Sequence, residues 1–284
     1  MGINAWFEKA MAGRWIAGRY AEDALRRTKE FNSFGISTLI NFLGEDISDG
    51  TKVKESVDVY LGLLGSIRGQ GLDASISVKP TQLGLLVDYR MFILNYTKIL
   101  KAAKKGGVFV WLDMETYNNI DRTIKAYKSS MGYGNSGICI QAYLRRSADD
   151  VSELLKGRAT IRLVKGAYKV ADDLRYNSTR ELNSNYMKIM RMLFSRAGRF
   201  MIATHDSRII EEAIRINRSA RRNMMFGMLN GIRNTYAMHL AGKGYKVAEY
   251  VPFGSDWISY GLRRITEEKH FSLIVRSMLE KQGL

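Results

Sequence analysis

The stretch ATIRLVKG, residues 159–166, is a short apolar run with an arginine inside it and a lysine near its end. A segment of helical character precedes it at residues 148–157, and another follows at residues 178–196. A short apolar run bounded in this way is typical of a strand buried on both faces of a parallel sheet. Seven other runs are of the same kind: residues 35–43, 75–80, 108–115, 137–144, 199–206, 222–229 and 245–253.

Segments with apolar residues three or four positions apart separate these runs and predict helices. One more helix is expected before the first run, at about residues 17–32, and another after the last run, at 255–281. The remaining helical segments are residues 51–69, 82–104, 117–131, 207–217 and 231–242.

Eight strands that alternate with helices predict an α/β fold, a single closed (βα)8 barrel. We expect one domain over residues 1–284, with an N-terminal helical extension at 1–34 and the barrel strands within 35–253. A C-terminal helix at 254–284 is expected to lie over the mouth that carries the active site. An open, doubly wound sheet is the alternative, but no GxGxxG motif follows the first run, where a dinucleotide-binding fold would place it.

The chain carries 44 Lys and Arg against 28 Asp and Glu, a formal net charge of +16. This charge favours anionic partners such as phospholipid headgroups or a phosphorylated ligand. Nucleic acid is disfavoured, because the basic residues form no long block and no stripe interleaved with aromatic residues. The single cysteine, Cys139, excludes a disulfide within the chain and a thiolate metal cluster, and we expect no metal.

No apolar run reaches the roughly 18 to 20 residues that a membrane-spanning helix needs. The absence of disulfides fits a reducing, intracellular setting. We therefore expect a cytoplasmic protein with, at most, peripheral contact with the inner face of the membrane.

Polar residues gather at the carboxyl ends of the predicted strands, where barrels of this kind carry their active sites. Arg162 is the most informative, because a buried charge inside an apolar run needs a partner. Taken singly, the others can be rim lysines, helix caps or a structural histidine. Together they indicate a pocket in which cations dominate, so an anionic ligand is favoured. The set is Lys79, Asp113, Glu115, Gln141, Arg162, Lys165, Thr204, His205, Asp206, Glu249 and Tyr250.

The predicted C-terminal helix adds Tyr260, Arg263 and Arg264, and Glu267 follows at a spacing that allows it to pair with either arginine. A guanidinium binds a carboxylate through two parallel hydrogen bonds. An adjacent arginine pair beside a tyrosine therefore predicts a carboxylate clamp. A solvated helix face is the alternative interpretation.

Seven segments resemble the motifs of the proline dehydrogenase family, in the family's order and at compatible spacings. The resemblance extends over about residues 17–270. It implies an FAD-dependent (βα)8 barrel that oxidises L-proline to Δ1-pyrroline-5-carboxylate, the first step of proline catabolism, by hydride transfer from proline C5 to flavin N5. The segments are SVKPTQLG (77–84), VWLDME (110–115), QAYLRRS (141–147), RLVKGAY (162–168), IATHD (202–206), GMLNGIR (227–233) and YVPFGSDWISYGLRR (250–264).

The resemblance also implies roles for individual residues. Asp113 and Arg162 would be catalytic, with Arg162 beside flavin N5. Electrons would pass to a quinone or another membrane acceptor, and a basic surface would suit an anionic membrane. The substrate would be bound by Lys79, Tyr168, Leu229, Tyr250, Tyr260, Arg263 and Arg264. The FAD would be bound by Met114, Gln141, Arg162, Lys165, Gly166, Ala167, Thr204 and His205.

Three residues depart from the family's pattern near the expected substrate wall: Pro80, Gly227 and Asn230. Pro80 restrains the backbone directly after Lys79 and is expected to shift that ammonium slightly. The residues alone also fit a Schiff-base lyase or aldolase that acts on an anionic substrate through Lys79 or Lys165. A basic binding protein without catalysis is a further alternative. FMN in place of FAD, and hydroxyproline in place of proline, stay open at this point.

Overall fold

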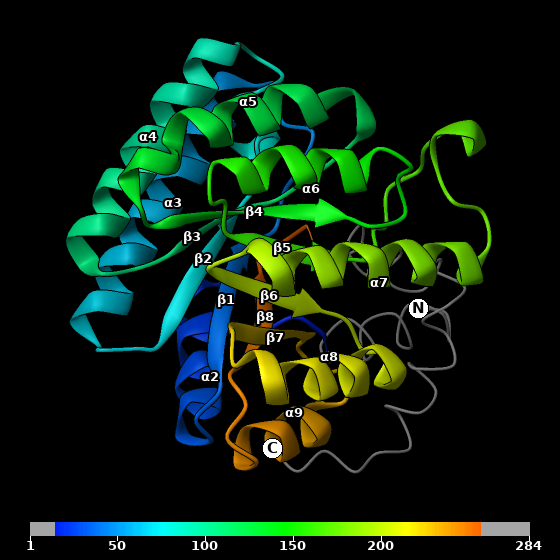
Figure 1. The fold of residues 1–284 in the computed structure, drawn as a ribbon. Coiled ribbons are helices and arrows are strands. Elements are labelled where there is room, and N and C mark those ends of the chain that lie inside the picture. The colour runs from blue at the N-terminus through cyan, green and yellow to red at the C-terminus, as the bar shows by residue number, and fades with distance from the viewer. Residues whose placement is uncertain (1–14, 257–284) are drawn as a thin grey trace, which may run out of the picture.

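The computed structural model describes residues 15–256, and within them eight parallel strands form a closed barrel (Figure 1). Each strand pairs with the next, and β8 returns to β1, where Leu39 lies opposite Tyr250. The predicted closed barrel is therefore confirmed, and the open sheet is excluded. The strands are β1 (Ser37–Phe42), β2 (Ala74–Val78), β3 (Val110–Leu112), β4 (Ser136–Gln141), β5 (Ile161–Val164), β6 (Arg199–Ala203), β7 (Asn223–Leu229) and β8 (Val247–Phe253).

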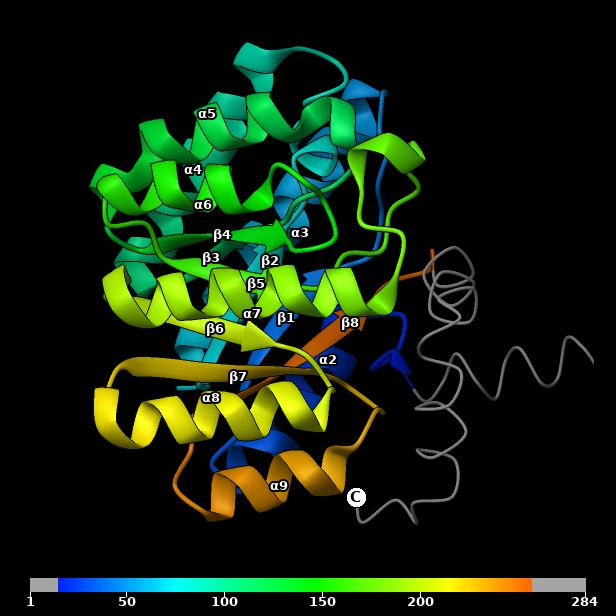
Figure 2. The same cartoon turned by 45° about the vertical axis from the view of Figure 1, so that its right-hand side comes forward.

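Helices alternate with the strands and surround the barrel (Figures 1 and 2). Helix α2 precedes β1 and packs against both β1 and β8, so it covers the seam where the barrel closes. Residues 257–284, most of the predicted C-terminal helix, lie outside the described residues. The helices are α2 (Ala21–Ser33), α3 (Gly50–Gly69), α4 (Tyr89–Gly106), α5 (Ile120–Ser130), α6 (Ser147–Lys156), α7 (Thr179–Arg196), α8 (Ser207–Ala220) and α9 (Asn234–Gly242).

Helix α4 begins at Tyr89, seven residues later than the apolar spacing predicts. The intervening chain forms a 3-10 turn, η1 (Thr81–Leu83), which ends at Gly84 with a φ of 104°. An L-residue rarely adopts this φ, so glycine is suited to the turn. The Asp88 carboxylate then accepts a hydrogen bond from the Met91 N–H at 2.9 Å and caps α4.

Two hydrophobic layers hold the barrel together. The larger one fills the space between the strands and the helices. Side chains alternate between the two faces of a strand, so Ala248 and Tyr250 point into the barrel and Glu249 between them points outward. The smaller layer contains residues from four strands around the barrel, β1, β3, β6 and β8, and therefore fills the barrel interior: Leu39, Trp111, Met201 and Ala248.

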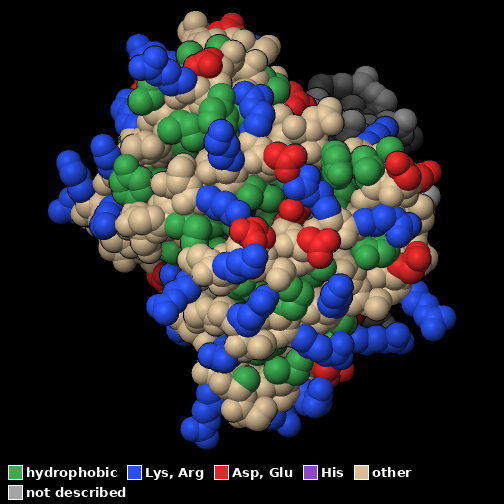
Figure 3. All heavy atoms as spheres, turned by 45° about the horizontal axis from the view of Figure 1, so that its top comes forward, with side chains coloured by type: hydrophobic (Ala, Val, Ile, Leu, Met, Phe, Trp, Pro, Cys, Tyr) green, Lys and Arg blue, Asp and Glu red, His purple; other side chains and the backbone are tan. Residues whose placement is uncertain are grey.

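Basic side chains are spread over the outer surface of the molecule. The face in Figure 3 shows more Lys and Arg than Asp and Glu, with hydrophobic side chains between them. This distribution agrees with the net charge of +16. The positive charge is thus carried by the outer helices as well as by the mouth of the barrel.

Candidate active site

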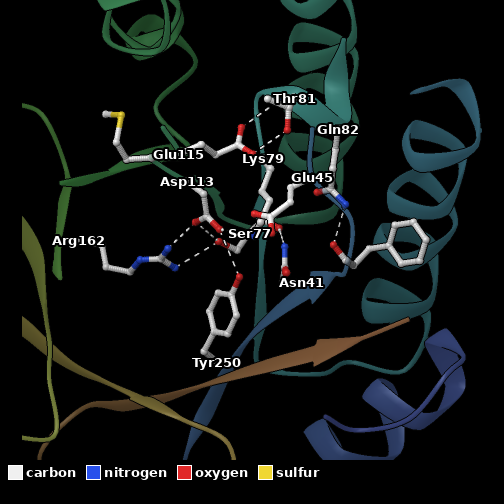
Figure 4. A network of polar contacts seen from close by, with 12 residues as sticks. Asn41, Glu45, Ser77, Lys79, Thr81, Gln82, Asp113, Glu115, Arg162 and Tyr250 are labelled. Carbon is white, nitrogen blue, oxygen red and sulfur yellow. Dashed lines mark hydrogen bonds and ion pairs between the residues drawn. The ribbon is translucent and has the colours of Figure 1, made fainter. Parts of the chain in front are cut away.

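A carboxylate at the end of β3, Asp113, is the centre of a buried polar network (Figure 4). The Ser77 hydroxyl donates to its Oδ1 at 2.5 Å, and Arg162 Nη2 forms an ion pair with the same oxygen. The Tyr250 hydroxyl donates to Oδ2 at 3.2 Å, and Lys79 Nζ lies 3.4 Å from Oδ2. Four side chains, two from the end of β2 and one each from β5 and β8, thus bind one carboxylate.

The alternation of side chains along the strands brings these groups together. Ser77 and Lys79 lie two positions apart, so they point to the same side of the chain, into the barrel. Arg162 enters from β5 and spans the barrel to reach both Asp113 and Ser77, with its Nη1 3.2 Å from Ser77 Oγ. Its guanidinium carbon lies 5.5 Å from the centre of the Tyr250 ring. The arginine inside the apolar run therefore has the buried partner that its position requires.

The network holds one more cation than anions. Burial alone would raise the pKa of Asp113, but the charges of Arg162 and Lys79 and the Ser77 hydrogen bond lower it below its ordinary value. Burial would lower the pKa of Lys79, but the neighbouring Asp113 carboxylate raises it. Arg162, Lys79 and Asp113 are therefore charged at neutral pH, and together these three groups carry one net positive charge, which suits an anionic ligand.

A second buried carboxylate, Glu115, fixes the turn that follows β2. It accepts hydrogen bonds from the Thr81 backbone N–H at 2.9 Å and from the Thr81 hydroxyl at 2.6 Å. Burial raises the pKa of Glu115 to about 7, although the Thr81 hydrogen bonds and the charge of Lys79 lower it. Pro80, directly before Thr81, has φ −51° and ψ −42°, and Lys79 still reaches Asp113.

The end of β1 contributes a group that the sequence analysis missed. The Tyr168 hydroxyl donates a hydrogen bond to Glu45 Oε2 at 2.8 Å. Glu45 directly follows the run GISTLINFLG, so the strand-end argument applied to the other runs would have selected it. Tyr168 lies in the segment that follows β5.

The ends of β5 and β6 are joined by an ion pair. Lys165 Nζ lies 2.9 Å from Asp206 Oδ2, and the Thr204 hydroxyl accepts a hydrogen bond from the Asp206 N–H at 3.2 Å. His205 Nε2 accepts the Leu229 N–H at 3.1 Å and so connects this edge to β7. Four of the predicted residues thus lie at one side of the mouth.

Leu229 and Tyr250 form part of an apolar wall beside the polar network. They pack against a buried cluster of Trp15, Ile16, Leu43 and Ile232. The sequence analysis named Leu229 and Tyr250 but not this cluster, because the four cluster residues come from three separate segments: before α2, after β1 and after β7. The wall offers an apolar surface next to a positive centre.

The three departures from the family's pattern have different surroundings. A Cβ at Gly227 would lie 2.7 Å from Met201 Sδ and 3.0 Å from Ala203 Cβ, so the close approach of β6 and β7 requires glycine. Asn230 accepts a hydrogen bond from Arg27 Nε of α2 at 3.0 Å. Its side chain therefore contacts α2.

The other predicted residues fall into two groups. Tyr260, Arg263, Arg264 and Glu267 lie outside the described residues. Gly166 has a φ of 106°, and a Cβ there would lie 2.0 Å from the Tyr143 ring, so this backbone has no room for a side chain.

Buried polar atoms that lack a hydrogen-bond partner indicate whether these residues fit a flavin. Gln141 Nε2 donates to the Met114 carbonyl at 3.1 Å, but its Oε1 has no hydrogen-bond partner within residues 15–256. The same is true of Arg162 Nε. One acceptor and one donor, on the neighbouring strands β4 and β5, are therefore available to a polar ring system, and the residues fit.

Fold and site together define a parallel (βα)8 barrel with a buried, net-positive centre at the carboxyl ends of its strands. A family model described as "Proline dehydrogenase" matches residues 24–276. The chain belongs to this proline dehydrogenase family.

Two relatives agree with this assignment, and a solved structure shows the same fold. Proline dehydrogenase 2 of Bacillus subtilis (strain 168) is 30% identical over 266 residues, which is 92% of this chain and 88% of the relative. Proline dehydrogenase of Deinococcus radiodurans is 31% identical over 280 residues, 95% of this chain and 90% of the relative. Proline utilization A from Bdellovibrio bacteriovorus, at 21% identity, has the same fold, with a TM-score of 0.85 over 95% of this chain and 34% of its own.

Proposed function

We propose that this protein is an FAD-dependent enzyme that oxidises L-proline to Δ1-pyrroline-5-carboxylate, the first step of proline catabolism. The observation that carries the proposal is the Asp113 network, in which two buried cations bind one carboxylate. Membership of the family supports proline as the substrate, since relatives from Bacillus subtilis and Deinococcus radiodurans carry the name proline dehydrogenase.

The excess positive charge suits the substrate carboxylate. Lys79 is a charged donor at the end of β2, and Arg263 and Arg264 of the predicted C-terminal helix would complete a clamp. A carboxylate held at one end of the substrate fixes the position of ring carbon C5, which is catalysis by positioning. The ring itself would lie among Tyr168, Leu229, Tyr250 and Tyr260.

Oxidation removes a hydride from C5 and a proton from the ring nitrogen as the C5=N bond forms, so the amine must be neutral in the reactive complex. Asp113 is a poor base for this proton, because four donors occupy it and two cations lower its pKa. Lys79 stays protonated. We therefore assign the proton to water, and the role of Asp113 is to position Arg162, Lys79 and Tyr250.

A bound flavin would supply the hydride acceptor that no amino-acid side chain offers. Gln141 and Arg162 have the free acceptor and donor described above, Lys165 adds positive charge, and Gly166 allows close approach of the backbone. The residues proposed to hold FAD are Met114, Gln141, Arg162, Lys165, Gly166, Ala167, Thr204 and His205.

We place the enzyme in the cytoplasm, at the inner face of the membrane, with a quinone-type electron acceptor. The net charge of +16 supports contact with an anionic surface. Within residues 15–256, no helix is both long and apolar enough to cross a bilayer.

A Schiff-base mechanism is disfavoured by the state of the two lysines. It requires a neutral amine as nucleophile. The Asp113 carboxylate raises the pKa of Lys79 despite burial, and Lys165 is engaged with Asp206. Neither lysine is prepared for attack on a carbonyl group.

An anaerobic absorption spectrum tests the proposal. We expect flavin bands in the purified protein, and bleaching of these bands by L-proline but not by D-proline. Bands that survive L-proline would contradict proline as the substrate while leaving a flavoprotein. A protein that takes up no flavin after reconstitution with FAD, and that borohydride traps with a carbonyl substrate, would establish the lyase instead.

A further inference from the structure

Helix α4 presents a basic face with no acidic residue. Its sequence, YRMFILNYTKILKAAKKG, contains five Lys and Arg and no Asp or Glu. Arg90, Leu94, Lys98 and Lys101 are exposed and follow one another at intervals of four, four and three residues, so they form one stripe along the helix. Within residues 15–256, no carboxylate lies within ion-pair distance of the three cations in this stripe.

Exposed aliphatic side chains adjoin this stripe. Leu94 is 61% exposed, and Leu86 and Val87 in the segment before α4 are 42% and 39% exposed. They are three of the five large hydrophobic side chains that are exposed in the described residues, and they fall within nine positions of the chain. Scattered single hydrophobic residues are ordinary on a surface, but a group beside unpaired cations indicates an interaction site.

The neighbouring helix extends the positive charge. Arg122 and Lys125 of α5 lie 5.5 Å and 5.8 Å from the centre of the Tyr89 ring of α4. The nearby exposed carboxylates are engaged, since Asp88 caps α4 and Asp121 pairs with Arg146.

We infer that Leu86, Val87, Arg90, Leu94, Lys98 and Lys101, here called the α4 surface, dock the protein on an anionic lipid membrane. Lys and Arg are attracted to the headgroups, and aliphatic side chains enter the boundary of the acyl chains. A nucleic acid would bind the three cations through its phosphates but would leave the two leucines and the valine without a partner. Proteins that bind single strands present aromatic side chains for stacking.

The α4 surface adjoins the mouth of the barrel. The connection that begins at Lys79 and Thr81 in the site ends at Leu86 and Val87 on the surface. Docking along α4 would lay the side of the barrel on the bilayer, which holds a lipid-soluble quinone, with Leu86 and Val87 at the end of the contact nearest the mouth. The inference thus deepens the proposed function, and access to a membrane quinone matters only if that function holds. The docking itself can be measured without turnover.

Vesicle binding of the full-length protein is the test. We expect sedimentation with vesicles of phosphatidylcholine and phosphatidylglycerol, little with phosphatidylcholine alone, and release by salt. K98Q/K101Q should weaken the partition roughly tenfold, and L86S/V87S/L94S should weaken it in low salt as well. K188Q/R218Q, on α7 and α8, removes the same charge elsewhere and should change the partition less than about twofold.

Each outcome decides the inference. Equal loss in K98Q/K101Q and K188Q/R218Q, or no binding to either vesicle, would overturn it. Duplex DNA that binds the native protein and not K98Q/K101Q, without vesicle binding, would assign the surface to nucleic acid. Circular dichroism shows that each variant folds. Bleaching of the flavin by L-proline in every variant separates this test from that of the proposed function.

Discussion

Two buried carboxyl groups on opposite sides of the barrel wall differ in the number of groups that bind them. Asp113, inside the mouth, accepts contacts from four side chains and has a lowered pKa. Glu249, on the outer side of β8, is 0% exposed, and neither of its oxygens has a hydrogen-bond partner within residues 15–256. Burial raises the pKa of Glu249 to about 8, and the charge of Arg27 offsets only part of this effect.

The difference shows that burial acts on both carboxyls in the same direction and that their partners decide which one stays ionised. The charge of Arg27 lowers the pKa of Glu249 only slightly, because the guanidinium binds two other side chains. Its Nε donates to Asn230 at 3.0 Å, and its Nη1 pairs with Glu30 at 2.7 Å. Thr28 and Thr38, at the same contact between α2 and β1, bind each other at 3.0 Å.

The largest effect is expected from Asp113→Asn, which removes the central charge of the network. Arg162 and Lys79 would be left buried without their anion, at a cost of about 3–5 kcal/mol in the free energy of unfolding. Proline oxidation should fall at least about a hundredfold, because both cations lose their orientation. Urea unfolding and initial rates measure the two effects.

Asp121→Asn is the matched control for this change. Asp121 pairs with Arg146, but its side chain is mostly exposed, so its removal should cost less than about 1 kcal/mol. A loss in Asp113→Asn no larger than this would show that the buried network does not hold the site together.

The next effect concerns the pH dependence of stability at Glu249. Its pKa in the folded state, about 8, exceeds its ordinary 4.5, so the folded protein retains a proton that the unfolded chain releases. Stability should therefore fall as the pH rises from about 4.5 to about 8. Glu249→Gln should remove this fall. Its free energy of unfolding should therefore exceed that of the native protein by an amount that grows by about 2–4 kcal/mol between about pH 5 and about pH 9.

Urea unfolding over this range of pH measures the slope, and Glu249→Met should flatten it as well, since it also removes the charge. An unchanged slope in both variants would mean that Glu249 is ionised in the folded protein. Asp113 acts in the opposite direction. Its folded pKa is lowered, so its contribution is present above its ordinary 3.8 and is lost as the pH falls through the lowered value.

The smallest effect is expected from Tyr250→Phe, which removes one of the four contacts of Asp113. The hydroxyl at 3.2 Å is lost, while the ring and its position over Arg162 are kept. The cost in unfolding free energy should be about 0.5–1.5 kcal/mol, with a severalfold higher KM for proline. Stability and KM effects as large as those of Asp113→Asn would show that Tyr250, rather than Asp113, organises the network.

The periodicity of the sequence predicted the barrel. Eight short runs that are apolar almost throughout indicate strands buried on both faces, and their alternation with helical segments is typical of a closed parallel barrel. It also predicted that Lys79, Asp113 and Arg162 lie together, since carboxyl ends of parallel strands share one edge. It did not predict that Arg162 pairs with Asp113 across an intervening strand. That contact depends on the reach of a long side chain through the barrel interior.

One residue was misjudged and one surface was not singled out, each for a physical reason. Glu249 was grouped with the residues of the mouth, but it neighbours Tyr250 on one strand and neighbours point to opposite sides. The prediction is wrong, and the alternation of β8 would have corrected it. The α4 surface was missed because its cations are spread along the sequence and become a stripe only at the helical repeat.

Helix α2 seals the junction of β1 and β8, and this junction has a consequence for synthesis of the chain. The Ser37 hydroxyl donates a hydrogen bond to the Val247 carbonyl, 210 positions away, so the partner of the first strand is synthesised long after that strand. Until then, Leu25 and Phe31 of α2 lack half of the wall that buries them. The apolar face of α2 therefore waits for its second wall while the chain between β1 and β8 is synthesised.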